Sequence, residues 1–513
     1  MAFSISNKRI AKNTLFLYFR MLFGICINLF TVRIIWQELG VEDYGIYNIV
    51  AGVVLMFQFL NSAMVSASQR YLAYAIGVNN TNLITQTFSS SIRVHYILAL
   101  IIFIIAESIG LWFLNYKLNL PSGKLLAANW VYQASAISFI IMVISVPYNA
   151  AIVAYEDMKI FGIYGIIEVI FKFLAAIALI FIYNNKLIIY SLLLLAVSIV
   201  MRLLYIRYCK KHYNYCIYRS GVENGATKDM FSFAGWNLLG SFGVSAREQG
   251  LNIILNMFFN VVYNAAKGIA NQVSGVVMGF TYNFQMSMFP QITKRYASGD
   301  IHSMLKLTFA GCQISYYLLL LLSGPIIFRA NYILSLWLKD GVSIEMEYFL
   351  IIMLISLLID SMKGPVAAAL QATGKIKIFQ IVIFTILISS LPIAWIWLRF
   401  VHDPYIVVYV TAITNLIALF ARFYLLKIQI GLYGQGKQIL WMAFQIIIVT
   451  ALYFSITFFY HSIFLLSPIS LIVYSMVSIF SGSILIYFFG LSHDLRKMIS
   501  ESIKAKLNKF SIS

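Results

Sequence analysis

Charged residues inside long apolar stretches are the side chains of this 513-residue chain with the most informative chemistry. A charge near the centre of a membrane-spanning helix costs about 2.5–3.5 kcal/mol on insertion scales, so it normally faces a partner or water. The bases in such stretches are Arg20, Arg33, Lys172, Arg202, Arg247, Lys267, Lys363 and Arg422, and the acids are Glu107, Glu168, Glu248 and Asp360. Because bases outnumber acids, we expect a cationic interior.

Several of these charges have a simple structural explanation. Glu168 and Lys172 are four residues apart, and Asp360 and Lys363 are three apart, so each pair can neutralise itself on one helix face. Three arginines lie near the ends of predicted spans, where a long side chain can reach the membrane surface; they are Arg33, Arg202 and Arg422.

The remaining bases, Arg20, Arg247 and Lys267, are candidates for binding an anionic headgroup. Polar residues recur on the same helical faces, which adds Asn28, Asn252 and Asn271 to the candidate site. The alternative for the amides is that they join helices through hydrogen bonds. The remaining acids, Glu107 and Glu248, are candidates for coupling to protons or sodium ions; the alternative is that each balances a basic neighbour.

The elements that must position these residues are membrane helices. The chain is 61% hydrophobic and 11% charged, with a mean hydropathy of +0.86, which is typical of a polytopic membrane protein. Apolar length places spans at 14–36, 44–67, 92–115, 125–149, 160–183, 186–208, 231–257, 262–289, 304–329, 345–370, 375–399, 403–425, 438–461 and 466–490. The sequence therefore predicts an all-α protein with about 14 transmembrane helices.

The distribution of basic residues predicts the orientation. The net charge of +19 indicates basic cytoplasmic loops facing anionic lipid rather than a nucleic-acid partner. Alternate loops carry 23 basic residues on one side and 6 on the other, so both termini are expected in the cytoplasm. In the tail, apolar residues at helical spacing among lysines predict an amphipathic helix on the cytoplasmic leaflet.

Two separate segments repeat at an interval of about 220 residues. Gly24, Ile34, Ile35, Tyr44 and Ala51 match Gly243, Ile253, Ile254, Tyr263 and Ala270, and after a six-residue slip Arg70-Tyr71 matches Arg295-Tyr296. Pro147, Ala150, Ala151, Lys159, Ile160, Phe161 and Ala176 match Pro365, Ala368, Ala369, Lys377, Ile378, Phe379 and Ala394. This predicts two six-helix lobes at 1–208 and 231–425, joined by a linker at 209–230 and followed by two helices at 426–490 and a tail at 491–513.

Motifs for enzymatic or metal chemistry are missing from the sequence. It contains no G-x-x-x-x-G-K-[ST] loop, no H-E-x-x-H motif and no Cys-x-x-Cys pair among its four cysteines. The predicted outer loops are too short for the catalytic loop of a polytopic glycosyltransferase or polymerase. We therefore expect a protein that is not an enzyme and needs no cofactor or metal.

The chain resembles the polysaccharide transporter branch of the multidrug/oligosaccharidyl-lipid/polysaccharide flippase superfamily, particularly O-antigen and capsule repeat-unit flippases. The residues that carry the resemblance are Arg9-Ile10-Ala11-Lys12-Asn13-Thr14, Leu39-Gly40-Val41-Glu42-Asp43-Tyr44-Gly45-Ile46-Tyr47, Gln69-Arg70-Tyr71 and the segment from Pro147 to Phe161. The resemblance implies a V-shaped cavity between the lobes and alternating access driven by an ion gradient.

The function that this resemblance implies is flipping of an undecaprenyl-diphosphate-linked oligosaccharide across the bacterial plasma membrane for polysaccharide or lipopolysaccharide synthesis. The expected partners are the lipid-linked oligosaccharide, membrane lipids and polysaccharide polymerase proteins, with no nucleic acid. A diphosphate headgroup suits the excess of bases. Lipid II flipping and multidrug export remain alternatives, although a cation exporter would favour unpaired acids and few arginines.

Overall fold

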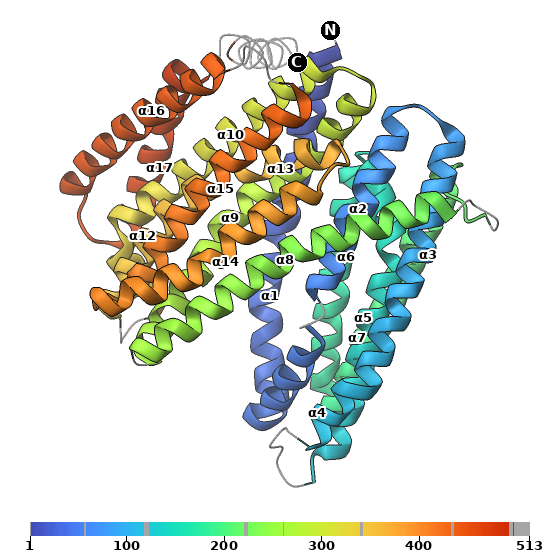
Figure 1. The fold of residues 1–513 in the computed structure, drawn as a ribbon. Coiled ribbons are helices and arrows are strands. Elements are labelled where there is room, and N and C mark those ends of the chain that lie inside the picture. The colour runs from blue at the N-terminus through green and yellow to red at the C-terminus, as the bar shows by residue number, and fades with distance from the viewer. Residues whose placement is uncertain are drawn as a thin grey trace, which may run out of the picture. The chain divides into compact units, whose positions relative to one another are not determined.

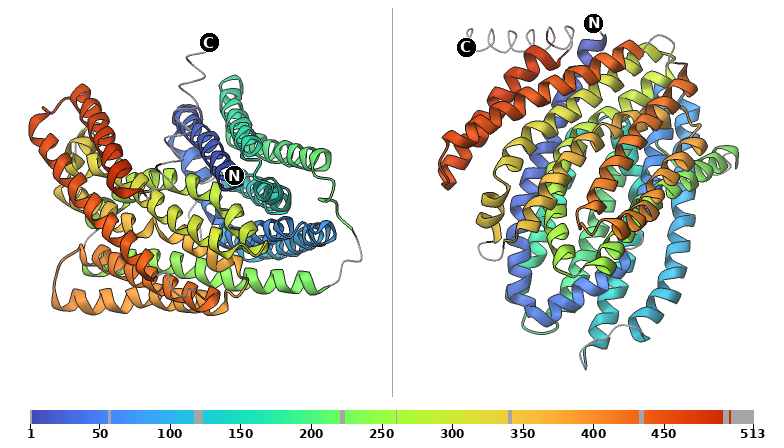
Figure 2. Two further views of the ribbon diagram at one scale, coloured as in Figure 1. Left: turned by 90° about the horizontal axis from the view of Figure 1, so that it is seen from above. Right: turned by 60° about the vertical axis from the view of Figure 1, so that its left-hand side comes forward.

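The computed structural model describes residues 2–55, 58–116, 123–219, 224–259, 261–338, 342–431, 436–491 and 496, and within these ranges the regular secondary structure is all helical, with no strand (Figure 1, Figure 2). The helices are α1 (Ala2–Leu55), α2 (Gln58–Gly77), α3 (Thr81–Ile105), α4 (Leu111–Tyr116), α5 (Leu125–Ala154), α6 (Met158–Ala178), α7 (Lys186–His212), α8 (Asn224–Phe258), α9 (Val261–Ala297), α10 (Ile301–Phe328), α11 (Ala330–Leu338), α12 (Ile344–Asp360), α13 (Lys363–Ala372), α14 (Lys377–Phe400), α15 (Ile406–Ile430), α16 (Gly436–Ile463) and α17 (Pro468–Leu485). The predicted all-α fold is confirmed.

Eleven of the described helices are long and apolar enough to cross a membrane, as expected of a multi-pass membrane protein. The other three predicted spans are 44–67, 231–257 and 262–289. The segment 44–67 covers the end of α1 and the start of α2, whereas 231–257 and 262–289 fall within the 35-residue α8 and the 37-residue α9. The total of 14 spans therefore stays a prediction. Of the predicted amphipathic tail, nearly all residues lie outside the described part of the chain.

The chain forms two compact units. One contains residues 10–242 with 293–299, and the other contains residues 1–9, 243–292 and 300–513. Equivalent turns precede α3 and α10 at close to the predicted interval. The turn before α3 has Asn79 at φ 56° and Asn80 capping Leu83 N, and the turn before α10 has Gly299 at φ 79° and Asp300 capping Ser303 N. These turns are 220 residues apart, close to the interval found in the sequence.

One part of the repeat alignment was wrong. Arg70 lies ten residues before the capping residue Asn80, whereas Arg295 lies five residues before its counterpart Asp300. Because the two turns align without a slip, Arg70-Tyr71 and Arg295-Tyr296 are not equivalent. The chance match of an Arg-Tyr pair produced the six-residue slip.

The two units differ at one equivalent helix. The helix α5 runs unbroken through Pro147, but its repeat equivalent is divided into α12 and α13 by a turn at Ser361 and Met362, just before Pro365. Interrupted membrane helices place backbone groups and charges at mid-span, and they are common at transporter binding sites. This interruption is the feature of the fold that positions the candidate site.

The last two helices pack on α10 within their own unit. Gln313 donates to Gln445, and the hydroxyl groups of Tyr316 and Thr450 lie 2.9 Å apart. Tyr453 fits between Gly324 of α10 and Gly482 of α17, where an added Cβ on either glycine would overlap the tyrosine ring. Small residues of this kind allow close approach of membrane helices.

We therefore expect Gly324→Leu to destabilise the protein by about 1–3 kcal/mol, because the added side chain must displace the buried ring of Tyr453. A thermal melt of the purified protein measures this as a lower Tm. Gly275→Leu is the matched control in the same unit, since a Cβ on Gly275 meets no atom within 4 Å. Equal Tm values for the two variants would show that the ring does not hold α16 against α10.

Reporter fusions test the predicted orientation. Fusions at Ser122, Asn185 and Asp340 should report the outer side, and fusions at Asn224 and Ser513 the cytoplasm. Asn185 lies in the turn before α7 and Asn224 begins α8, while the other three lie outside the described residues. A cytoplasmic signal at Asp340 would overturn the assignment of the second six-helix lobe.

Candidate functional site

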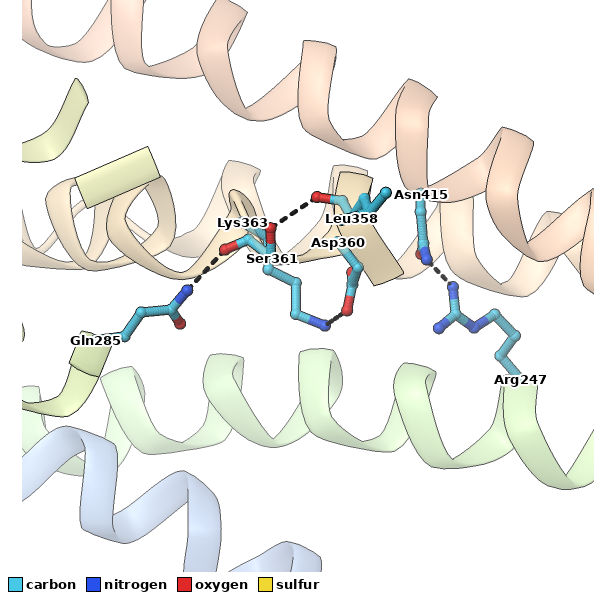
Figure 3. Close-up of polar contacts among 7 residues, drawn as sticks. All are labelled: Arg247, Gln285, Leu358, Asp360, Ser361, Lys363 and Asn415. Carbon is cyan, nitrogen blue, oxygen red and sulfur yellow. Dashed lines mark hydrogen bonds and ion pairs between the residues drawn. The ribbon is translucent and has the colours of Figure 1, made fainter. Parts of the chain in front are cut away.

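Arg247 is a buried cation held by a neutral partner. It lies within α8 with 5% of its surface exposed, and its Nη1 donates to Oδ1 of Asn415 on α15 at 2.8 Å (Figure 3). Its Nε is buried and has no hydrogen-bond partner among the described residues. No carboxylate of the described chain lies within ion-pair distance, so the charge of Arg247 is only partly compensated.

Lys267 has a similar environment on α9. Its side chain is 8% exposed, and Nζ donates to Oδ1 of Asn252 at 2.5 Å. Asn264 donates to the backbone carbonyl of the same Asn252 at 3.4 Å. The structure thus places two of the predicted residues, Lys267 and Asn252, in direct contact, whereas Asn271 is exposed further along α9. Lys267 also interacts electrostatically with the carboxylate of Glu248 and, as a like charge in the same unit, with Arg247.

The interruption between α12 and α13 carries an ion pair. Lys363 Nζ lies 2.5 Å from Oδ2 of Asp360, which confirms the predicted pair. The pair nevertheless joins two helices rather than one, because the turn at Ser361 and Met362 separates its members. Spacing of three residues fits both arrangements, so the sequence did not distinguish them.

Gln285 of α9 stabilises this interruption from the side. Its Nε2 donates to the carbonyl of Ser361 at 2.6 Å (Figure 3). The same Nε2 donates to Oγ of Ser315 at 3.0 Å. The carbonyl that the broken helix leaves free is therefore satisfied, as a membrane interior requires. Gly364 makes room for Gln285, because a Cβ at that position would overlap the amide.

Asp360 is shared by several cations. Its side chain is 12% exposed and interacts electrostatically with Lys363, Arg422 and Arg247. The expectation that Arg422 reaches the membrane surface was wrong, since its residue is 8% exposed and faces Asp360. Arg422 lies about two turns before α15 ends at Ile430, and packing against α12 draws it inward.

Arg20 belongs to the other unit, where it lies on α1. Its guanidinium carbon is 4.6 Å from the ring centroid of Phe161, an arrangement that stabilises a cation without a carboxylate. Asn28 is exposed on the same helix. In this unit the predicted pair of Glu168 and Lys172 is also present, with a 2.6 Å contact.

Glu107 occupies a π-helical turn, Ala106–Gly110, between α3 and α4. Its Oε2 accepts from Nε2 of Gln133 on α5 at 3.0 Å, and Oε1 is buried without a hydrogen-bond partner among the described residues. Tyr132 donates to the carbonyl of Ala106 at 2.8 Å, which satisfies a backbone group at the turn. Turns of this type are frequent at functional sites. Glu248, the other candidate, has an exposed side chain on α8.

The sequence assigned no role to Asn415, and it placed Arg422 at the membrane surface. Asn415 and Arg422 are seven residues apart and share one face of α15, a signal that a search for polar stripes on that helix would have found. Gln285 shares the polar face of its helix with Lys267, but the sequence does not show its partner, the carbonyl of Ser361, which has no helical N–H partner because Pro365 lies four residues later.

Comparison with known proteins identifies the fold of this chain. No family model and no curated protein matches the chain. Among solved structures, a multidrug resistance MATE family transporter of the MOP superfamily, in an outward-facing conformation, matches with a TM-score of 0.71 and 14% identity, covering 82% of this chain and 96% of that one. The chain has the MATE fold.

Two further structures agree with this fold. A MATE protein in a straight conformation matches with a TM-score of 0.71 and 14% identity over 83% of this chain and 96% of that chain. A MOP superfamily transporter from Pyrococcus furiosus, described as having a binding pocket of reverse polarity that suggests a different function, also matches. The MATE fold agrees with the predicted all-α membrane architecture, and the fold alone does not distinguish the branches of the superfamily that the sequence resembles.

Proposed function

We propose that this chain flips an undecaprenyl-diphosphate-linked oligosaccharide from the cytoplasmic to the outer leaflet of the plasma membrane, by ion-coupled alternating access. The observation that carries the proposal is the pair of buried cations, Arg247 and Lys267, each bound to an amide rather than a carboxylate. A charge without a counter-ion in a membrane interior is costly unless a ligand uses it. Arginine and lysine bind phosphoryl groups through strong charge-assisted hydrogen bonds.

Export of organic cations is the second candidate, because one solved structure with this fold is a multidrug resistance transporter. The charges of this chain favour an anion instead. Asp360, a largely buried carboxylate in the same unit as Arg247, already interacts with three cations, and the exposed Glu248 interacts with Arg247 and Lys267. A cationic drug would therefore meet repulsion from Arg247 and Lys267. Lipid II flipping requires the same diphosphate chemistry and stays an alternative within the same mechanism.

Reconstitution tests the proposal. Purified protein in proteoliposomes should move a fluorescent polyprenyl-diphosphate oligosaccharide between leaflets and leave an organic cation such as ethidium untransported. The initial rates of both substrates are measured in the same vesicles, with protein-free vesicles as the baseline. Transport of ethidium without movement of the lipid would establish the multidrug alternative. Movement of lipid II in preference to a repeat-unit lipid would assign the substrate to peptidoglycan synthesis.

A further inference from the structure

The charges around the interrupted helix do not balance. Lys363, Arg422 and Arg247 all interact electrostatically with Asp360, while Arg247 and Lys267 also interact with the exposed carboxylate of Glu248. The group thus has four cations and two carboxylates, which leave an excess of two positive charges. Asp360 forms its direct ion pair with Lys363, so its negative charge neutralises the two arginines only in part.

The arginines in this group also have unused donors. Arg422 makes no hydrogen bond within the described residues, and its Nε is buried. The Nε of Arg247 is buried and unpartnered as well, again among the residues that the structure describes. Both side chains are more than nine-tenths buried, so water does not fully hydrate them. Buried donors of this kind are usually satisfied by a partner, which points to a ligand that accepts hydrogen bonds.

The backbone adds a further favourable feature. The helix α13 begins at Lys363, and Met362 in the cap position makes no side-chain hydrogen bond to it. The start of a helix carries a partial positive charge that favours anions. At the repeat interval of 218 residues, Asp360 and Lys363 correspond to Met142 and Ser145 of the unbroken α5. The charged interruption therefore occurs at α12–α13 and has no counterpart in α5.

We propose that Arg422, Arg247 and Lys363 form a diphosphate-binding subsite at the α12–α13 interruption, with Asp360 as the internal counter-ion that the ligand displaces. The inference deepens the proposed function and rests on it for the identity of the transported lipid. A diphosphate that links a lipid to a sugar carries two negative charges, which match the excess of two positive charges. Two guanidinium groups suit two phosphoryl groups because each can donate in a bidentate manner.

The role assigned to Asp360 gives the proposal a distinctive signature. Removing Arg422 should weaken diphosphate binding, whereas removing the carboxylate of Asp360 should strengthen it, because the ligand no longer competes with an internal anion. If these residues served only to stabilise the fold, both changes would lower the stability of the protein. They would then not have opposite effects on the affinity for the diphosphate.

The test uses the full-length protein in detergent with inorganic pyrophosphate as the probe. Binding is measured by the shift of Tm and by isothermal titration calorimetry. We expect Arg422→Gln to weaken pyrophosphate binding by about tenfold or more and Asp360→Asn to tighten it by about tenfold. Arg399→Gln is the matched control, because Arg399 is exposed on α14 of the same unit, over the ring of Trp395. Its affinity should be unchanged.

Further arms distinguish the sources of the anion. Farnesyl diphosphate should bind with the same dependence on Arg422, whereas phosphatidylglycerol added to the micelles should not. Unchanged pyrophosphate affinity in a folded Arg422→Gln protein would overturn the subsite, as would an Arg422-dependent response to phosphatidylglycerol without one to pyrophosphate. If Arg422→Gln fails to fold, weaker binding to Asp360→Asn than to the wild type would overturn it instead.

The outcomes also separate this subsite from the proposed function. Wild-type protein that flips the lipid-linked oligosaccharide while Arg422→Gln flips it equally well would refute the subsite and leave the function standing. If the wild-type protein binds pyrophosphate through Arg422 but flips no lipid-linked oligosaccharide, the proposed function is refuted and the subsite stands.

Discussion

Replacing Arg247 by Ala should reduce flipping of the lipid-linked oligosaccharide by about 10- to 100-fold while the protein remains in the membrane in normal amounts. The loss of a charge-assisted hydrogen bond costs about 1.5–3 kcal/mol, which corresponds to this range of rates. Initial flipping rates in proteoliposomes, normalised to reconstituted protein, provide the measurement. Folding should tolerate the change, because Asp360 keeps Lys363 and Arg422 as partners.

Two further variants make this result specific. Arg247→Lys should recover only part of the activity, because an ammonium group keeps the charge but loses the bidentate guanidinium geometry. Arg399→Ala, which removes an exposed arginine from the same unit, should transport at the wild-type rate. An Arg247→Ala protein that bound and flipped the substrate normally would mean that Arg247 serves only to bind Asn415 and hold α8 against α15.

Lys267 and Arg20 are expected to have related but distinct roles. Lys267 holds Asn252 by a direct hydrogen bond, so its replacement changes both a charge and a contact between α9 and α8. Arg20 makes a cation–π contact with the ring of Phe161, in the unit that does not contain Lys267. We retain the prediction that Arg20, Arg247 and Lys267 contact the headgroup at successive stages of its passage.

The sequence predicted the parts of this molecule that depend on local pattern. Apolar length gave the helices, and spacing along a helix gave the pairs of Glu168 with Lys172 and Asp360 with Lys363, both of which form. The repeat interval gave the equivalence of the turns at Asn79 and Gly299. Each of these features is determined by residues close together in the chain or by comparison of the chain with itself.

The parts that were missed depend on contacts between distant segments. The division of α12 from α13 has no local cause in composition, because α5 contains the equivalent proline and is continuous. The stabilising contact comes from Gln285, 76 residues away from Ser361 in the chain. Arg422 was misplaced for the same reason, since its distance from the end of α15 does not reveal that α12 lies beside it.

The second large effect is expected at Glu107, which we predict to couple transport to an ion gradient. Its buried Oε1 has no partner among the described residues, which leaves a position where a proton or a sodium ion can bind. Glu107→Gln should preserve the fold, because the new amide oxygen can still accept from Gln133, but it cannot take up a proton. We expect gradient-driven accumulation to fall about tenfold or more, while flipping without a gradient continues.

The measurement compares flipping rates in proteoliposomes with and without an imposed proton or sodium gradient. Glu347→Gln is the control, since Glu347 also accepts from an amide, that of Asn331, but this hydrogen bond is exposed at the start of α12. Glu248→Gln separates the two predicted coupling residues, and the exposure of Glu248 favours Glu107 as the more important one. Full gradient dependence in both Glu107→Gln and Glu248→Gln would exclude both acids and place coupling elsewhere in the chain.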